Sequence, residues 1–318
     1  MEAYNYDRQT DRQTDRQTDR RIAFLILAHT DPYVLKKLCE ALDDCRFDLY
    51  IHIDKKSDIA SFHIENYALK YSHLYVIPKR INVRWGDISV VDATISMYRQ
   101  AYESENYFRY VTLSGLDFPI KSNDEIYNTL TRDNIEFIQG NPVRGAELHK
   151  VKNIYLWKLG RFGGVIRRVM KLLRIERKGE LNINGKAAQV YFAPQWHALS
   201  GKFVEYMLSV IQNDNVREFF RFSYAPDELM LPTILFNNEE FKKHAIACDF
   251  PMNTHYNAKS TLHYLNYEPV IEVFDEESFE KIIDSDKLFV RKVKFGISNK
   301  LIELILARIQ CGANSDTM

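Results

Sequence analysis

The sequence is poor in cysteine, on which disulfide frameworks and many zinc sites depend. It has four cysteines among 318 residues, scattered without a CxxC or Cys/His spacing. This pattern argues against a zinc site and against a disulfide framework, and a reducing cytoplasm is the expected compartment. Glycine and proline, with 12 and 9 residues, form no rich linker that would divide the chain into domains.

Net charge and long apolar runs are also missing. Lys plus Arg and Asp plus Glu number 43 each, so the formal charge is zero and no overall basic field attracts nucleic acid. No apolar run reaches the roughly 18 residues of a membrane-spanning helix, and the N-terminus lacks the apolar core of a signal peptide. We expect a soluble cytoplasmic protein without a nucleic-acid partner, at most peripheral to a membrane, whose oligomeric state is open.

The N-terminal tail differs from the rest of the chain. Residues 7–20 repeat the unit Asp-Arg-Gln-Thr with almost no apolar content. Such a segment buries too little surface to offset its ordering entropy, so we expect residues 1–20 to be disordered. A tetranucleotide tract encodes the same four-residue period, and gain or loss of one unit shifts the reading frame. We therefore hypothesise switched expression (phase variation), with a neutral expansion as the alternative.

Beyond the tail, strand and helix patterns alternate. With 46% apolar and 13% aromatic residues, the chain can bury a large core. The βαβα order implies an α/β fold with a mostly parallel, Rossmann-type sheet flanked by helices, and we favour a single large domain over residues 21–318. Strands are predicted at 21–28, 47–54, 73–78, 107–113, 134–139 and 287–292, a strand and turn at 190–200, and helices at 32–42, 88–102, 201–213, 226–237 and 298–310.

One segment of the second half, residues 161–178, combines helical apolar spacing with many cations. Two interpretations fit this pattern. The segment docks on anionic lipid at a membrane surface, or it forms a solvated helix face or a mobile flap. Both place it at the surface.

The most informative motif is the run YVTLSGLDFPIKS at residues 110–122. An apolar strand leads into Ser-Gly and delivers Asp117 to its carboxyl end, where Pro119 stops regular pairing. In open α/β sheets ligands bind outside the carboxyl ends of the strands. The alternative is that Asp117 caps the next helix.

Two other predicted strands end in polar residues. His29 follows the first strand and Asp54 ends the second, so both face the same rim of a parallel sheet. There an imidazole and a carboxylate can hold a uracil edge and a ribose, although each is also compatible with a structural role. Arg84 and Trp85 precede Gly86, which suits either stacking on a base or sugar, or core packing of the indole.

Two charged groups lie in the second half. Asp227 and Glu228 follow Pro226 at the start of a predicted helix, where carboxylates serve either as a catalytic base or as simple stabilisers of the helix N-terminus. Arg291 and Lys292 lie on a late strand. In a pocket they would neutralise a diphosphate, and elsewhere they form an ordinary cationic face.

Taken together, these motifs resemble one family. Over residues 21–295 the chain is similar to the core-2/I-branching β-1,6-N-acetylglucosaminyltransferases and the peptide O-xylosyltransferases, and its motifs occur in the family's order. The segments that carry the resemblance are His29, HIDKKS, Trp85-Gly86, LSGLDFPIKS, PQW at 194–196, PDE at 226–228 and FVRK at 289–292.

The resemblance implies an inverting, metal-independent transferase with a GT-A-like fold that uses a UDP-sugar. Residues 21–140 would form the nucleotide-sugar half and residues 141–318 the acceptor and catalytic half. The implied reaction moves a sugar, N-acetylglucosamine or a related one, onto a bacterial surface glycan or glycolipid such as lipooligosaccharide. A xylosyl- or galactosyltransferase, a non-catalytic carbohydrate- or nucleotide-binding protein and a nucleotide-sugar hydrolase are the alternatives. The missing anchor, stem and cysteine framework of animal relatives favours a bacterial member.

Donor-site roles carry over residue by residue. By resemblance, His29 and Asp54 meet the uridine, and Arg84 with Trp85 lies beside that pocket. Asp117 falls at the donor-site strand end.

Catalytic and acceptor roles carry over in the same way. Glu228 matches the carboxylate that acts as catalytic base, and Lys292 matches a basic residue at the diphosphate. Trp196, Tyr224 and Asp227 are candidates for the acceptor wall.

Two departures concern the charge at the diphosphate. The family commonly places an arginine where this chain has His263, and we expect Arg291 to compensate for it. HIDKKS has no second carboxylate two residues from Asp54, so a metal-binding DxD pair is missing there. Asp284 and Asp286 have that spacing but suit a solvated turn. We therefore expect no metal, with Arg291 and Lys292 in its place.

Overall fold

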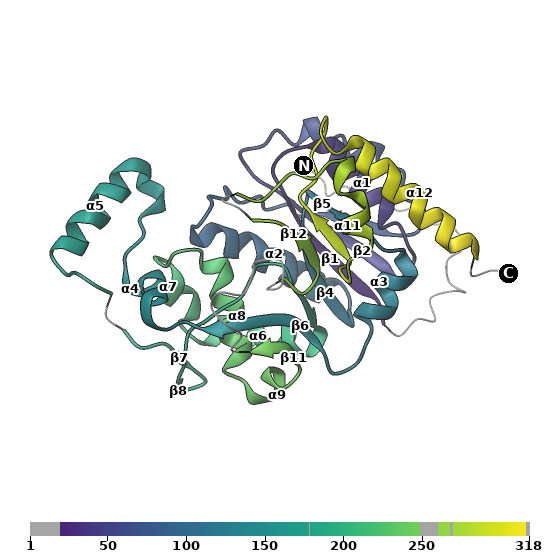
Figure 1. The fold of residues 1–318 in the computed structure, drawn as a ribbon. Coiled ribbons are helices and arrows are strands. Elements are labelled where there is room, and N and C mark those ends of the chain that lie inside the picture. The colour runs from purple at the N-terminus through teal and green to yellow at the C-terminus, as the bar shows by residue number, and fades with distance from the viewer. Residues whose placement is uncertain (1–19, 178, 249–259, 268–269, 316–318) are drawn as a thin grey trace.

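The computed structural model describes residues 20–177, 179–248, 260–267 and 270–315 (Figure 1). The tail that we expect to be disordered lies outside the described residues, apart from Arg20. Within the described part, no helix combines the length and the apolar character needed to cross a lipid bilayer.

The centre of the fold is one large sheet with the strand order β11-β6-β10-β4-β1-β2-β3, and β9 pairs with β6. β1 runs parallel to β2 and β4, whereas β10 lies antiparallel between β4 and β6. The α/β class with a mostly parallel sheet is therefore confirmed. The strands are β1 (Ile22–Ala28), β2 (Phe47–Ile53), β3 (His73–Val76), β4 (Arg109–Ser114), β6 (Glu136–Pro142), β9 (Tyr191–Phe192), β10 (Ala198–Ser200) and β11 (Ala245–Cys248).

Helices cover both faces of this sheet because side chains of β1 alternate between two cores. Ile22, Phe24 and Ile26 pack with apolar residues of α1, α3 and α12, whereas Ala23 and Leu25 pack with those of α2, α6 and α8. β10 comes from the predicted second half, so one sheet joins both halves. The helices are α1 (Pro32–Ala41), α2 (Ile88–Ser104), α3 (Asn123–Leu130), α6 (Gly201–Asn213), α8 (Met230–Phe236) and α12 (Asn299–Ser315).

A small second sheet lies beside the carboxyl end of β4. It contains β5 (Asp117–Pro119), β12 (His263–Leu265) and β13 (Phe289–Arg291) in the order β12-β13-β5. β13 is antiparallel to β5, and this register pairs Arg291 with Asp117. Two segments far apart in the sequence are thereby brought together at the strand end that the sequence singled out.

Helix α5 projects from the body at the left of Figure 1.

The predicted helix at 226–237 is partly wrong. Pro226–Glu228 forms a 3-10 turn, η5, and α8 begins only at Met230. The helix starts late because Ala225, the residue before the proline, adopts a left-handed conformation with φ 46°. The other elements are α4 (His149–Lys152), α5 (Gly160–Leu172), α7 (Val216–Phe220), α9 (Glu239–Lys242), α11 (Phe279–Ile283), β7 (Asn182–Ile183), β8 (Lys186–Ala187), and the 3-10 turns Ala60–Phe62, Ile64–Asn66, Gly145–Leu148, Trp157–Leu159 and Glu276–Ser278.

Candidate functional site

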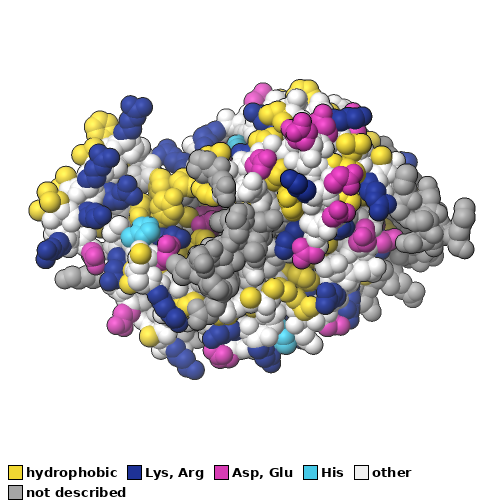
Figure 2. Space-filling view, viewed as in Figure 1, with side chains coloured by type: hydrophobic (Ala, Val, Ile, Leu, Met, Phe, Trp, Pro, Cys, Tyr) yellow, Lys and Arg dark blue, Asp and Glu magenta, His cyan; other side chains and the backbone are white. Residues whose placement is uncertain are grey.

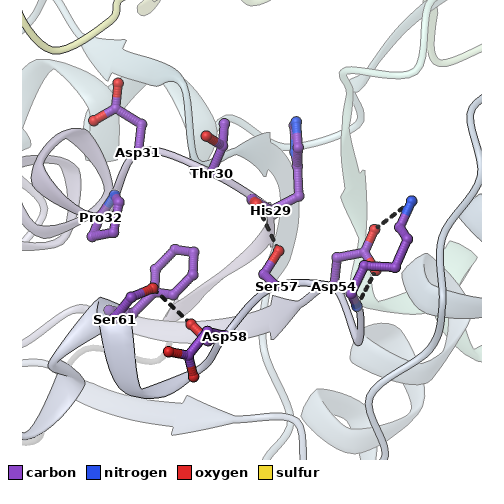
Figure 3. A pocket seen from close by; sticks show the side chains of 10 residues that line it. His29, Thr30, Asp31, Pro32, Asp54, Ser57, Asp58 and Ser61 are labelled. Atoms are coloured by element: carbon purple, nitrogen blue, oxygen red, sulfur yellow. Dashed lines mark hydrogen bonds and ion pairs between the residues drawn. The ribbon is translucent and has the colours of Figure 1, made fainter.

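A cavity of about 420 Å³ opens at the carboxyl ends of β1 and β2 (Figure 3). The backbone N–H of Asp54 donates to the Ala28 carbonyl over 2.8 Å, which sets the two strand ends side by side. The Ser57 hydroxyl donates to the His29 carbonyl over 2.6 Å and ties the following turn to the first strand. We call this the strand-end cavity; it is lined by His29, Thr30, Asp31, Pro32, Asp54, Lys56, Ser57, Asp58, Ser61 and Phe62.

The Asp54 carboxylate holds two backbone segments in place beside this cavity. Its side chain is almost fully buried, and Oδ1 accepts hydrogen bonds from the backbone N–H groups of Lys56, over 2.9 Å, and Val83, over 3.4 Å. The Lys56 ammonium lies 3.4 Å from Oδ2. The carboxylate therefore fixes both its own turn and the loop that leads to Trp85.

His29 connects the cavity with the end of β13. Partial desolvation lowers the pKa of its exposed imidazole; the Asp54 carboxylate opposes this shift, and Arg291 and Lys292 add to it. The Phe295 N–H, four residues beyond Arg291, donates to Oδ2 of the cavity residue Asp31 over 2.7 Å, so the segment that follows β13 lies against the strand-end cavity. The structure thus brings together four of the residues predicted for the donor site.

Asp117 lies at the centre of a buried group that we call the ionic cluster, made of Asp117, His263 and Arg291. Its Oδ1 accepts from Arg291 Nη1 over 2.7 Å, and its Oδ2 accepts from His263 Nε2 over 3.0 Å and from the backbone N–H of Ser114 over 2.7 Å. Burial works to raise the pKa of Asp117, but Arg291 and His263 hold it below its usual value. With 0% exposure, the carboxylate positions its two partners.

The capping interpretation of Asp117 does not hold. The next helix, α3, is capped by Ser122, whose hydroxyl accepts from the backbone N–H of Glu125 while Glu125 reaches back to the N–H of Ser122. Asp117 makes no such bond and faces β12 and β13 instead.

Trp196 and Lys292 flank the ionic cluster. The Arg291 guanidinium lies 4.4 Å from the centre of the Trp196 ring, so this predicted acceptor residue packs on the cation. Desolvation lowers the pKa of Lys292, and repulsion from Arg291 and Lys294 adds to the shift. An anion placed beside Lys292 would relieve that repulsion.

A second group, which we call the aromatic cluster, consists of Trp85, Tyr155, Trp157 and Tyr224. The Tyr224 ring lies 5.2–5.8 Å from the other three ring centres, and Trp85 is 72% exposed. Gly86 makes this packing possible, because it has φ 74° and a Cβ there would lie 2.7 Å from the Trp157 ring. Trp85 therefore offers an open ring face, as expected for stacking and not for core packing.

Glu228 and Asp227 follow the aromatic cluster on η5. The Ala193 N–H donates to the Glu228 carbonyl over 2.9 Å and holds the turn in place. The Glu228 N–H donates over 3.0 Å to the carbonyl of Ala225, the residue after Tyr224. Burial raises the pKa of Tyr224, and the Glu228 carboxylate raises it further. The N-cap residue of η5 is Ala225, whose side chain cannot accept a hydrogen bond, and both carboxylates lie in the first turn. Stabilisation of the helix N-terminus therefore stays open as the alternative role for Asp227 and Glu228.

Asp227 is in an unusual environment. Its Oδ1 is buried and has no hydrogen-bond partner among the described residues. Burial raises the pKa of this carboxyl to about 6.

The other predicted residues are placed as follows. Arg84 donates from Nη1 to the Lys158 carbonyl over 3.1 Å, so it holds the segment before α5 and not the cavity wall. Asp284 follows α11 and the Asp286 side chain is 86% exposed, which fits the solvated turn. Among the residues that the structure describes, no three His, Cys, Asp or Glu side chains gather in a way that could hold a metal ion.

These positions can be compared with known proteins. The family model for the Core-2/I-Branching enzyme matches residues 22–283. The chain belongs to this family. The resemblance predicted from the motifs is thereby confirmed.

The curated relatives of this Core-2/I-branching family member are much longer than the chain. Xylosyltransferase 1 of Canis lupus familiaris is 23% identical over 235 residues, which cover 69% of this chain and 22% of the relative. Xylosyltransferase 2 of Homo sapiens is 25% identical over 238 residues, covering 69% of this chain and 25% of the relative. The chain thus spans about a quarter of the length of these proteins.

Solved structures show only distant likeness. Glucosyl-3-phosphoglycerate synthase from Mycobacterium tuberculosis, in complex with Mn2+, UDP and glucosyl-3-phosphoglycerate, gives a TM-score of 0.36 at 9% identity and covers 74% of each chain. Mouse xyloside xylosyltransferase 1 gives 0.30 at 9% identity, covering 70% of this chain and 84% of the other. Such scores say nothing about this chain's substrates.

Sequence reasoning about this family member missed several residues that the geometry adds. Lys56 and Ser57 line the strand-end cavity, and the signal was present, since both lie in HIDKKS beside Asp54. Tyr155 and Trp157 also belong to the aromatic cluster, although no site residue was predicted between Asp117 and Trp196. Their alternation in NIYLWK was the available clue.

Proposed function

We propose that this chain is an inverting glycosyltransferase that moves a sugar from a UDP-sugar to a hydroxyl group of a glycan. One observation carries the proposal: the segment that follows Arg291 and Lys292 lies against the strand-end cavity, where the Phe295 N–H donates to Asp31 Oδ2 over 2.7 Å. A polar cavity with fixed cations beside it suits a nucleoside diphosphate.

In this proposal the nucleotide occupies the strand-end cavity. His29 and Asp54 contact the uridine, while Arg291 and Lys292 face the diphosphate. Negative charge grows on the β-phosphate as the sugar leaves, and pre-positioned cations stabilise that charge without reorganisation. Asp117 supports this role because it holds the Arg291 guanidinium through a 2.7 Å ion pair. We therefore propose a reaction that requires no metal.

Glu228 is the proposed catalytic base. In an inverting transfer the acceptor hydroxyl attacks the anomeric carbon on the face opposite the departing nucleotide, and a carboxylate takes its proton. The aromatic cluster beside Glu228 supplies the exposed Trp85 ring, on which a sugar can stack. Tyr224, Asp227 and Trp196 complete the proposed acceptor wall.

For the donor and acceptor we propose N-acetylglucosamine and a bacterial surface glycan such as lipooligosaccharide, with the reaction in the cytoplasm. A xylosyltransferase is the second candidate, because the relatives described above carry that name. A binding protein without turnover would have no use for Glu228 on η5.

A screen of UDP-sugars tests the proposal. The full chain is titrated by calorimetry with UDP-N-acetylglucosamine, UDP-xylose and UDP-galactose, and transfer to deacylated lipooligosaccharide is then followed with and without EDTA. We expect one donor to bind and its transfer to survive EDTA. Abolition by EDTA with rescue by manganese would overturn the metal-independent mechanism, and failure of every donor to bind would overturn the function.

A further inference from the structure

Helix α5 carries an apolar face that is open to solvent. Phe162, Val165, Val169 and Leu172 are spaced by three, four and three residues, which puts them on one side of the helix. Their exposed fractions are 78%, 56%, 50% and 82%. Figure 1 shows the helix standing away from the rest of the protein. An apolar stripe of this kind on a projecting helix is typical of an interaction site.

The charge around this apolar face has one sign. From Trp157 to Ile175 the sequence contains six cations and no acidic residue. Figure 2 shows dark blue and yellow side chains together on this part of the surface. Long cationic side chains beside an apolar stripe can keep their charge at a phosphate layer while the apolar groups enter the acyl boundary. The six cations are Lys158, Arg161, Arg167, Arg168, Lys171 and Arg174.

α5 is also fixed relative to the aromatic cluster. The Arg167 guanidinium lies 5.0 Å from the centre of the Tyr155 ring, and Arg84 donates to the Lys158 carbonyl just before the helix. Gly163 allows close contact, because a Cβ there would collide with the Leu156 carbonyl. Whatever binds the apolar face therefore comes to lie near Trp85.

We propose that α5 docks the protein on a membrane surface that contains anionic phospholipid. Charge complementarity selects this partner, since anionic headgroups attract juxtaposed Lys and Arg side chains. A second copy of the chain is disfavoured as the occupant, because two copies of residues 157–175 would bring twelve cations together without a carboxylate from this segment. Resting on the proposed function, the same placement makes the acceptor a membrane-borne glycolipid presented to the aromatic cluster.

Vesicle flotation of the full chain tests the docking, and it needs no UDP-sugar. The vesicles consist of phosphatidylcholine alone or of phosphatidylcholine mixed with phosphatidylglycerol. We expect flotation with the anionic vesicles, weakening as salt is added, and little flotation with phosphatidylcholine alone. Equal flotation with both compositions, or none with either, overturns the proposal.

The apolar contribution is tested with Phe162→Ser combined with Leu172→Ser. We expect this pair to lower vesicle affinity about tenfold or more, because two large apolar side chains no longer enter the bilayer. Ile246→Ser is the matched control, since Ile246 is 50% exposed on β11. An unchanged vesicle affinity overturns the proposal. So does a variant that still floats with the vesicles but, in light scattering, no longer self-associates, because the apolar face would then bind a second copy of the chain.

The ionic contribution is tested with Arg168→Glu combined with Lys171→Glu. We expect a loss of about tenfold or more, whereas Lys202→Glu with Lys243→Glu makes the same charge change on the exposed surface of other elements and should have little effect. Equal losses in the two pairs would mean that only net charge matters, which contradicts a site on α5. Circular dichroism and thermal unfolding show that each variant is folded.

Sugar transfer separates this inference from the proposed function. With lipooligosaccharide incorporated in the anionic vesicles, both α5 pairs should lower transfer while transfer to the deacylated, water-soluble glycan stays unchanged. A chain that floats but transfers no sugar retains the docking site and loses the proposed function. Transfer that is equal on vesicles for wild type and both pairs overturns the membrane-borne acceptor.

Discussion

The ionic cluster and the aromatic cluster are built in opposite ways. Asp117 is fully buried and its two oxygens are paired with strand and backbone groups, whereas Trp85 is 72% exposed and is held by ring contacts. Backbone register between β5 and β13 sets the first cluster. Packing between loops and a 3-10 turn sets the second.

This contrast suggests a division of labour within the proposed reaction. A buried carboxylate that pairs with Arg291 keeps the cation in one position, as stabilisation of a leaving diphosphate requires. Rings held by contact offer a broad, sequence-tolerant surface that suits variable glycans. We therefore expect loss of the buried Asp117 carboxylate to affect folding strongly, and loss of the Glu228 carboxylate next to the aromatic cluster to affect turnover more than stability.

Asp117→Ala should have the largest effect. Removing the carboxylate leaves Arg291 and the buried His263 without their partner, and breaking a buried ion pair costs about 3–5 kcal/mol. Urea unfolding measures this loss of free energy of unfolding. Asp286→Ala is the control, because that side chain is 86% exposed and should change stability by less than about 0.5 kcal/mol. A comparable loss of free energy of unfolding in both variants would mean that the buried ion pairs of Asp117 do not stabilise the fold.

Glu228→Gln should have the next largest effect, and on turnover instead of folding. A glutamine cannot take the acceptor proton, so we expect turnover to fall about 10²-fold or more while UDP affinity is kept. Initial rates and calorimetric titration measure the two quantities. Glu218→Gln on α7, whose carboxylate pairs with Arg221 at the surface, is the control. Unchanged turnover would remove Glu228 from the role of base.

Much of the ionic cluster and of the strand-end cavity could be predicted from the sequence. Strand endings are visible as apolar runs that stop at a polar residue, which pointed to His29, Asp54 and Asp117. The pairing of Asp117 with Arg291 could not be predicted, because it depends on a register between segments 174 residues apart. The short strands β5 and β12 have too few residues to show a period.

The aromatic side was much harder to predict. Trp85 and Tyr224 were named, but Tyr155 and Trp157 lie in a segment without clear periodicity. The contact of Trp157 with Gly86 depends on a tertiary approach that no local pattern encodes. The start of α8 was missed for a similar reason, since the left-handed Ala225 is imposed by packing around η5. Loops that meet only in three dimensions leave little trace in one sequence.

Asp227→Asn tests how the buried carboxyl on η5, next to the aromatic cluster, makes stability depend on pH. The pKa of Asp227 is about 6 in the folded chain against an ordinary value of 3.8, so the unfolded state releases this proton first as pH rises. The wild type therefore loses stability between about pH 4 and pH 6, and the loss is complete above the folded pKa. The variant lacks this group and should gain about 3 kcal/mol on the wild type across that window. Urea unfolding at a series of pH values measures this difference. If the free energy of unfolding changes with pH in the same way in the wild type and in the variant, Asp227 is well solvated.

Lys292→Ala should have the smallest effect and links the ionic cluster to the ligand. Lys292 already feels repulsion from Arg291 and Lys294, so a diphosphate beside it gains a charge-assisted contact that uridine cannot make. We expect UDP affinity to fall about tenfold while uridine affinity stays nearly constant, with the difference shrinking as salt screens it. Lys300→Ala is the control because its side chain is exposed on α12, where it pairs with Glu303. Equal losses for UDP and uridine would place Lys292 away from the phosphates.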